Sequence, residues 1–290
     1  MASPSLRLST NVEGDFYVDS TCIDCDACRQ IAPHTFREED GSSAVYRQPR
    51  GVTELLEAQK ALISCPTASI GSISKRSMTE ALAAYPELID NAVYRCGFTS
   101  EDSFGAFSYL IQRKSGNILI DSPRFAGPLV KRITSMGGVA RMLMTHRDDV
   151  ADHEKFRRRF GCERLMHSAD VSTRTRSVEI QPEGNSPQMI AEDLLMIPTP
   201  GHTRGHVVFL HEQRVLFTGD HLAWDESRDR LHAFRSACWY SWAEQTKSME
   251  RLLDHRFEWV LPGHGRPIHL PFDRMHHELA KCVEWMKAVR

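Results

Sequence analysis

Three glycine-containing turns in the C-terminal half of the sequence each offer a side chain that can bind a divalent metal ion. PGHTRGH presents His202, TGDHL presents Asp220, and PGHG presents His264. Apolar runs typical of buried strands precede all three turns. Imidazole nitrogens and carboxylate oxygens are donors that zinc, iron and manganese accept in proteins. One such turn is typical of any surface histidine beside a glycine, but three of them at strand ends predict a shared metal site.

Four of the eight cysteines have the spacing of iron–sulfur ligands. Cys22, Cys25 and Cys28 form a C-x2-C-x2-C run, and Cys65 is followed by a proline. In the two-cluster run C-x2-C-x2-C-x3-C-P the fourth cysteine binds the other cluster, and here Ala32 occupies that position. The spacing therefore favours one [4Fe–4S] cluster with Cys65 as the fourth ligand. A structural zinc site would use two separated C-x2-C pairs, and a disulfide framework would suit a secreted chain.

The other cysteines and the aromatic residues near the turns are predicted to be structural. Four isolated cysteines have apolar or aromatic neighbours, which is typical of buried thiols: Cys96, Cys162, Cys238 and Cys282. His206 is predicted to pack beside the ligand turn, whereas His221 and Trp224 are candidates to line a pocket. The aromatic run at 233–242, AFRSACWYSW, is aromatic enough to form a pocket wall, but such clusters are more often core, and we predict a core position with no catalytic role.

Short strands and helices must position these motifs. Residues 207–210 and 215–217 are predicted strands joined by a turn, and the second runs directly into the turn of Asp220. Farther upstream, the apolar pattern predicts a hairpin, a helix and a buried strand at 107–121, 126–136 and 140–144. Apolar residues recur at helical spacing over 51–63, which predicts a helix that delivers Cys65 to the cluster.

Composition defines the broad class of protein. The chain has 290 residues, a formal net charge of −2 and 41% hydrophobic residues, which is typical of a soluble globular protein. Its sequence has no basic stripe that would indicate nucleic-acid binding, and no apolar run of the roughly 20 residues that span a membrane. The first residues, MASPSLRLSTNVEG, lack the apolar core of a secretion signal. We therefore predict a cytoplasmic protein, with a short organelle-targeting segment as the alternative.

Two parts of the chain resemble known families. The order PGHTRGH, FTGDHL and LPGHG resembles the second half of the metallo-β-lactamase superfamily, whose fold glyoxalase II-like hydrolases and flavodiiron proteins share. This resemblance covers residues 91–290 and implies an α/β fold, the αββα sandwich. The C-x2-C-x2-C stretch resembles a single-cluster [4Fe–4S] ferredoxin, which implies a small α+β domain over 15–74. Residues 75–90 would then form a linker helix.

The first ligand loop of that superfamily, H-x-H-x-D-H, is matched imperfectly. The corresponding sequence of this chain is HRDDVADH, which begins at His146. Aligned forward from His146, Asp148 takes the second histidine position. Aligned backward from the next helix, Asp148 and Asp149 replace the Asp-His pair. A third register places Asp152 and His153 there and needs an insertion.

The resemblance implies a ligand set for one or two divalent ions of zinc, iron or manganese. The set consists of His146, Asp148, Asp149, His202, Asp220 and His264. Asp220 would bridge two ions, and Asp220 and Asp148 are the candidate catalytic residues. In a competing interpretation Asp149 only caps a helix over 150–159. In another, the site is degraded and holds one ion or none.

The resemblance leaves three functions open. The first is a metal-dependent hydrolase of a small-molecule substrate, with a ferredoxin domain that is regulatory, structural or electron-transferring. The second is an oxidoreductase in which the cluster, served by a redox partner, feeds a di-iron site resembling that of flavodiiron proteins. Carboxylates in the first loop favour it, but no flavodoxin-like domain follows. The third is a non-catalytic iron–sulfur sensor. Of the three functions, we favour the hydrolase, because most members of the superfamily are hydrolases.

Overall fold

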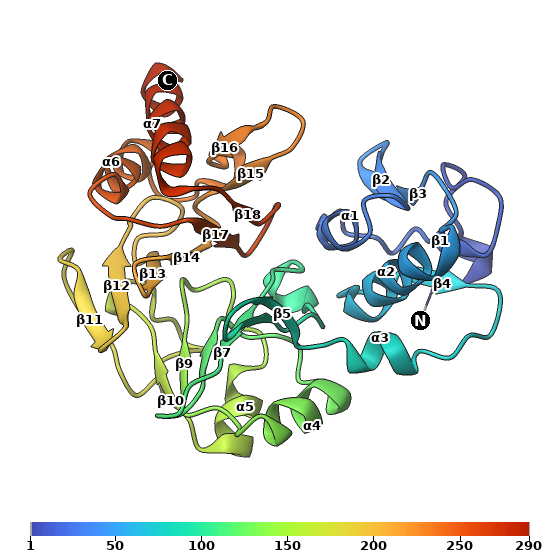
Figure 1. Cartoon of the computed structure of the whole chain (residues 1–290), viewed down its shortest axis with the longest axis horizontal. Coiled ribbons are helices and arrows are strands. Elements are labelled where there is room, and N and C mark those ends of the chain that lie inside the picture. The colour runs from blue at the N-terminus through green and yellow to red at the C-terminus, as the bar shows by residue number, and fades with distance from the viewer. Residues whose placement is uncertain (1, 290) are drawn as a thin grey trace. The chain divides into compact units, whose positions relative to one another are not determined.

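The computed structural model describes residues 2–289, which form two compact units. Unit 1 extends to Met142 and also contains Ala151–Cys162, whereas unit 2 consists of Leu143–Val150 and the chain from Glu163 onward. The cluster cysteines therefore lie in unit 1, and all six predicted metal ligands lie in unit 2. The elements of both units are labelled along the chain in Figure 1.

The N-terminal part of unit 1 consists of two small antiparallel sheets and two helices. Strand β1 (Phe16–Val18) pairs with β4 (Ile70–Ser72), and β2 (Phe36–Glu39) pairs with β3 (Ser42–Val45). Helix α1 (Ala27–Ile31) begins inside the cysteine run, and α2 (Gly51–Ser64) ends at the residue before Cys65. The prediction of a helix that delivers Cys65 is confirmed.

The rest of unit 1 contains an antiparallel sheet and the helices that pack on it. After α3 (Thr79–Ala83), the paired strands are β5 (Glu87–Asp90), β6 (Val93–Arg95), β7 (Tyr109–Ile111) and β8 (Ile118–Ile120). Helices α4 (Gly127–Ser135) and α5 (His153–Phe160) share with them a core that includes Leu110, Leu119, Leu129, Ile133 and Phe156. The predicted hairpin and the helix after it are confirmed.

Unit 2 contains a six-stranded sheet in the order β11-β12-β13-β14-β17-β18. The strands are β11 (Gln188–Ala191), β12 (Leu194–Pro198), β13 (Val207–His211), β14 (Val215–Gly219), β17 (Trp259–Pro262) and β18 (Ile268–His269). β14 and β17 run parallel, and the other neighbouring pairs run antiparallel. The strands predicted over 207–217 are confirmed.

Two helices pack on this sheet. Helices α6 (Trp242–Leu252) and α7 (Phe272–Ala288) share a core with the strands, which includes Leu216, Val260, Met249 and Leu279. The two helices lie side by side in Figure 1. Shorter elements are β9 (Arg141–Leu143), β10 (Glu163–Leu165) and the hairpin of β15 (Ala223–Asp225) and β16 (Arg230–His232). Among the described helices, none has the length and apolar character needed to cross a membrane.

One end of the unit 2 sheet gathers the last two ligand turns. Because β14 and β17 are parallel neighbours, their carboxyl ends meet at the same end of the sheet. The Gly263 N–H donates to the Gly219 carbonyl over 2.8 Å, which joins the two turns directly. Asp220 and His264, each one residue beyond these glycines, are therefore neighbours.

The other two ligand turns reach the same end of the sheet. β12 runs in the direction of β14, because β13 lies between them and is antiparallel to both. The turn of His202 thus leaves β12 beside the turn of Asp220. The Val207 N–H, at the start of β13, donates to the Thr145 carbonyl over 2.8 Å. This bond brings His146, the next residue, to the same place.

Candidate metal centre and iron–sulfur site

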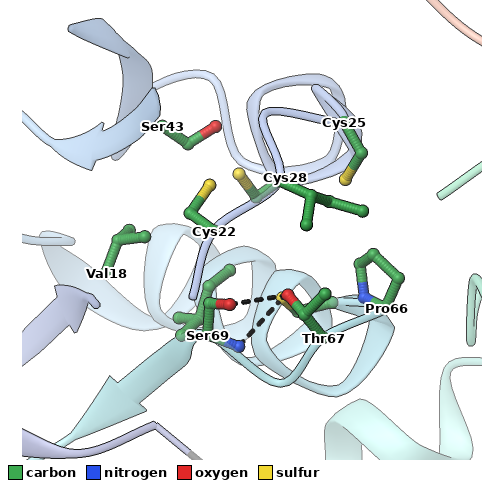
Figure 2. Close-up of a pocket in the computed structure, with 11 residues that line it drawn as sticks. Val18, Cys22, Cys25, Cys28, Ser43, Pro66, Thr67 and Ser69 are labelled. Carbon is green, nitrogen blue, oxygen red and sulfur yellow. Dashed lines mark hydrogen bonds between the residues drawn. The ribbon is translucent and has the colours of Figure 1, made fainter. Parts of the chain in front are cut away.

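The four predicted cluster cysteines line one cavity in unit 1, together with apolar side chains such as Val18 and Ile70. Cys65 follows the end of α2, Cys22 and Cys25 lie in the loop that leads into α1, and Cys28 lies in the first turn of α1. Figure 2 shows the last three around the space, across from Thr67. Sequence positions far apart are thus joined in one sulfur-lined pocket.

The protonation of these thiols indicates what group they suit. Burial, together with the neighbouring Cys65 and Cys22 thiols, raises the pKa of Cys25 to about 12, and burial also raises the pKa of Cys28. Four thiolates so close together would repel one another. The irons of a cluster supply the positive charge that lets four sulfurs bind as thiolates. The donor set therefore fits a [4Fe–4S] cluster.

An arginine fixes the loop that carries the first three cysteines. Asp24 and Asp26 have left-handed backbone conformations, with φ of 57° and 70°, which favour glycine over aspartate. Arg29 offsets this strain, since its Nη1 donates to Asp24 Oδ1 and its Nε to Asp26 Oδ1, each over 2.6 Å. The Asp24 N–H then lies 3.4 Å from Cys22 Sγ, where it stabilises a thiolate. No sequence motif indicated this role of Arg29.

Residues beyond the predicted ferredoxin range also hold the cluster ligands. Thr99 donates through its N–H and its hydroxyl to the Ser64 carbonyl, over 3.2 and 2.8 Å. Arg124 donates to the Ile63 carbonyl over 2.9 Å. These bonds satisfy carbonyls at the end of α2, where a cation also interacts favourably with the helix dipole. The position of Cys65 therefore depends on the chain that follows the ferredoxin domain.

In unit 2 three histidines converge on one carboxylate oxygen. The Nε2 atoms of His146, His202 and His264 lie 3.6, 3.7 and 3.7 Å from Asp220 Oδ2. Donor atoms bound to one ion at about 2.0–2.2 Å stand about 3.3–3.6 Å apart in tetrahedral geometry. The observed distances therefore suit a metal ion among these side chains better than hydrogen bonds between them.

The aspartates of the first loop join the same group. Asp148 Oδ2 lies 3.6 Å from His202 Nε2 and 3.9 Å from His146 Nε2. Donor atoms of Asp149, His146 and Asp220 lie within 4.8 Å of one another. The structure thus brings together all six predicted ligands, and their role as metal ligands stays a prediction.

Gly263 shows how closely two of the carboxylates approach each other. A Cβ at this position would lie 2.7 Å from Asp220 Oδ1 and 2.9 Å from Asp149 Oδ2, so only glycine fits without a shift. Two buried carboxylates in one place repel each other unless a proton or a cation lies near them. A divalent cation is the group that this arrangement suits.

Burial and charge also favour a bound cation. His146 and His202 are 0% and 2% exposed. Both ring nitrogens of His202 and Oδ1 of Asp220 are buried without a hydrogen-bond partner in the described part of the chain, which is costly unless a ligand satisfies them. Burial alone would raise the pKa of Asp220, but the His264 and His146 imidazoles bring it well below its usual range. The donor set therefore fits one or two divalent ions.

Asp152 and His153 have structural roles within unit 1. The Asp152 carboxylate accepts the Phe125 N–H over 2.7 Å and pairs with Lys155 at 2.8 Å. His153 is buried and is the first residue of α5. The competing interpretation, in which Asp149 caps a helix from residue 150, is wrong, because α5 begins at His153 and Val150 packs in a hydrophobic core before it.

A fully buried carboxylate that the sequence did not reveal joins two ligand loops. Asp170 Oδ2 accepts the Arg147 N–H over 3.0 Å and the Thr203 hydroxyl, and Oδ1 accepts the Gly205 N–H over 2.7 Å. Arg147 lies between two predicted ligands of the first loop, and Thr203 is the residue after His202. Asp170 therefore sets the distance between the two loops.

Two further histidines pack against the predicted ligands. The His206 ring centroid lies 5.2 Å from that of His146 and 4.9 Å from that of His221, with which it stacks. Nδ1 of His206 lies 2.9 Å from the Thr199 hydroxyl. Burial lowers the pKa of His206 and lowers that of His221 to about 3, so both rings are neutral. His206 packs as predicted, whereas Trp224, a candidate to line a pocket, is part of the hydrophobic core.

The aromatic run near His202 differs from its prediction. Trp239 and Tyr240 are 68% and 49% exposed, so they do not belong to the core. Their N–H groups both donate to the His202 carbonyl over 3.0 Å, which fixes the backbone there and leaves the rings in solvent. Three of the four isolated cysteines are buried as predicted, but Cys238 is partly exposed. Its thiol donates a hydrogen bond to the Gly201 carbonyl.

Comparison with known proteins assigns the cysteine region. Residues 18–72 match the family model described as the 4Fe-4S single cluster domain of Ferredoxin I. This part of the chain is a single-cluster ferredoxin domain. The match confirms the predicted resemblance of this region to a single-cluster ferredoxin and the predicted [4Fe–4S] cofactor.

Two curated relatives match part of the chain. The beta-lactamase-like protein 2 homolog of Drosophila melanogaster is 26% identical over 102 residues, which cover 34% of this chain and 32% of that protein. The hydroxyacylglutathione hydrolase of Rhodospirillum rubrum is 28% identical over 121 residues, which cover 40% of this chain and 47% of that protein. The chain spans about a third to a half of the length of these relatives.

Solved metallo-β-lactamases share the fold. DIM-1 metallo-beta-lactamase superposes with a TM-score of 0.54 at 13% identity, over 70% of this chain and 97% of that chain. The metallo-beta-lactamase from Pontibacter korlensis gives a TM-score of 0.52 at 18% identity, over 69% of this chain and 97% of that chain. The protein therefore contains a metallo-β-lactamase fold, which confirms the predicted α/β fold class.

Proposed function

We propose that the metallo-β-lactamase fold of this protein is a metal-dependent hydrolase of a small-molecule substrate. The observation that carries the proposal is the convergence of His146, His202 and His264 on one oxygen of Asp220. The name of the Rhodospirillum rubrum relative, a hydroxyacylglutathione hydrolase, supports hydrolysis. The ferredoxin domain adds a [4Fe–4S] cluster to this enzyme, and we expect a redox partner for it.

The six donors divide between two ion positions. His146, Asp148 and His202 would hold one ion, Asp149 and His264 the other, and Asp220 would lie between them. Bound divalent ions supply a nucleophile from water near neutral pH and polarise the carbonyl or phosphoryl group under attack. Asp170 contributes by holding the first and second ligand loops at a fixed distance, so the donors keep their spacing during turnover.

The two candidate catalytic carboxylates differ in exposure. Asp220 is buried, and its lowered pKa keeps a fixed negative charge among the imidazoles at neutral pH. The Asp148 side chain is 49% exposed, and the adjacent His202 imidazole lowers its pKa. We assign to Asp148 the transfer of a proton to bulk water, because its carboxylate lies beside a buried imidazole and still contacts solvent.

Metal analysis of the full chain, purified without oxygen, tests the proposal. The wild type should contain metal beyond about four cluster irons and should hydrolyse at least one of a thioester, a lactam and a phosphodiester. His202→Ala, Asp220→Ala and His264→Ala should each lose the additional metal and the activity, with Asp220→Ala the most severe. His277→Ala, on an exposed face of α7, is the matched control and should keep both.

The same measurements distinguish the competing functions. A wild-type chain without metal beyond the cluster would overturn the hydrolase and favour an iron–sulfur sensor. Additional iron together with dioxygen or nitric oxide reduction, and no hydrolysis, would favour an oxidoreductase. The carboxylates of Asp148 and Asp149 are hard oxygen ligands, which favour iron or manganese over zinc. A hydrolase could therefore also contain iron, so iron content alone does not decide between the functions.

A further inference from the structure

Trp239 and Tyr240 expose large aromatic surfaces beside a buried metal-binding centre. They are 68% and 49% exposed, whereas His202 is 2% exposed. The ring centroids of Trp239 and His202 are 6.2 Å apart, and their planes are inclined by 59°. Large apolar side chains left in solvent are characteristic of binding surfaces, and these two lie next to a predicted metal ligand.

Backbone hydrogen bonds fix this pair to the loop of His202. The N–H groups of Trp239 and Tyr240 donate to the His202 carbonyl, and the Ser241 N–H donates to the Gly201 carbonyl, each over 3.0 Å. The thiol of the residue before Trp239 donates to the same Gly201 carbonyl. The backbone that carries the two rings is therefore held beside the predicted ligand.

The next tryptophan of the run, Trp242, shows that the outward position is specific to this pair. Trp242 begins α6, and its Nε1 donates to the Met286 and Val289 carbonyls over 3.1 and 3.0 Å. Its ring contacts Trp285 edge to face, at 5.8 Å between centroids. The fold therefore anchors one tryptophan of the run and leaves Trp239 available to a ligand.

We infer that Trp239 and Tyr240 determine substrate specificity by binding a planar aromatic group beside the bond that is cleaved. This inference rests on the proposed hydrolase function. Aromatic side chains stack on flat rings and lose little conformational freedom when they do so. The substrate class is an ester or thioester of an aromatic acid. Hydrolysis adds water across the acyl bond and releases the acid and an alcohol or thiol, without an oxidant.

Matched thioesters of phenylacetic acid and cyclohexylacetic acid test this inference on the metal-loaded full chain. The wild type should show a lower KM for the flat ring. Trp239→Ala should raise that KM roughly 5- to 10-fold, with the KM for the saturated ring and the metal content unchanged. Trp239→Phe should retain most of the preference. Met189→Ala, which removes an exposed side chain on β11, is the control and should change neither KM.

Binding of phenylacetate, measured by isothermal titration calorimetry, separates this inference from the proposed function. We expect phenylacetate to bind the wild type at least about fivefold more tightly than Trp239→Ala. Hydrolysis of both thioesters with equal KM in wild type and Trp239→Ala would refute the aromatic specificity and leave the hydrolase standing. If neither thioester is cleaved, the binding measurement decides, and equal affinity of the two proteins would refute the inference.

Discussion

The cluster site and the metal centre obtain their ligands in opposite ways. Three of the four cluster cysteines lie within the short segment 22–28, which leads into the first turn of α1, and Cys65 follows α2 directly. The predicted metal ligands come from four turns at one end of a sheet, between His146 and His264. Residue spacing alone therefore indicates the cluster site, whereas the metal centre exists only after the sheet has aligned its turns.

The two sites also differ in the protonation of their ligands. Burial raises the pKa of Cys25 to about 12, so this thiol is protonated until iron binds. The pKa of Asp220 is lowered despite burial, by the His264 and His146 imidazoles, so this carboxylate is ionised beforehand. Cluster assembly must therefore release protons, whereas the carboxylates of the predicted metal centre would bind an ion without this step.

The largest effect is expected for Cys65→Ala, which removes the one cluster ligand outside the segment 22–28. Iron and sulfide analysis of anaerobic protein should fall from about four irons to three or none. Metal binding in unit 2 should be unchanged, because its predicted ligands belong to other residues. Cys282→Ala, a buried thiol of unit 2, should keep the brown cluster. A colourless protein that holds one zinc at the cysteines would contradict the assignment.

Asp148→Ala and Asp152→Ala should separate the possible registers of the first ligand loop. Asp148→Ala should lower the metal content beyond cluster iron, because a donor 3.6 Å from His202 Nε2 is lost. Asp152→Ala should keep the metal and lower the free energy of unfolding by about 1–3 kcal/mol, because the Phe125 N–H loses its acceptor. Loss of metal in Asp152→Ala alone would restore the register that needs an insertion.

Asp170→Asn should weaken metal binding although it replaces none of the predicted metal ligands. We expect the affinity to fall about 10- to 100-fold, the range for residues that orient metal ligands, because the carboxylate between two ligand loops loses its charge and one acceptor. Competition against a chelating dye measures this, with the cluster absorbance unchanged. Asp229→Asn, whose side chain is 80% exposed, is the control. Equal affinity in Asp170→Asn would show that the loops hold their spacing without it.

The smallest effect is expected for Arg29→Gln in the cysteine loop. The cluster should still assemble, but the left-handed residues Asp24 and Asp26 should lose about 1–3 kcal/mol of support. Decay of the visible absorbance in air should therefore be severalfold faster than in the wild type. Arg37→Gln, which removes an exposed partner of Glu39, should decay like the wild type. If Arg29→Gln lost its visible absorbance at the wild-type rate, the conformation of the cysteine segment would not depend on Arg29.

The sequence predicted those parts of both sites that depend on residue type and local spacing. The cysteine run, the helix before Cys65 and the strands before the last ligand turns follow from such patterns. Asp170 was not predictable, because its role depends on the N–H groups of Arg147 and Gly205. Those residues lie in two segments that only the folded sheet brings together. The spacing of apolar residues in the sequence does not indicate such contacts.

The aromatic run shows a different limit of sequence reasoning. Composition indicates that Trp239 and Trp242 prefer burial, but it does not say in which direction each side chain points. The direction is set by the bonds to the His202 carbonyl and by the start of α6. The first ligand loop is similar, because the sequence does not fix the residue at which α5 begins, and the roles of Asp149 and Asp152 depend on that start.

The bonds from Thr99 and Arg124 to the end of α2 also bear on the biosynthesis of the protein. A ribosome releases the chain from its N-terminus, so Cys65 emerges before either partner. The carbonyls of Ile63 and Ser64 gain all of these hydrogen bonds only after residue 124 has emerged. In a nascent chain that bound iron and sulfide earlier, the carbonyls at the end of α2 would still lack these hydrogen bonds, so Cys65 would be less firmly positioned. We therefore expect the cluster to be inserted late, on a chain whose metallo-β-lactamase fold has already begun to form.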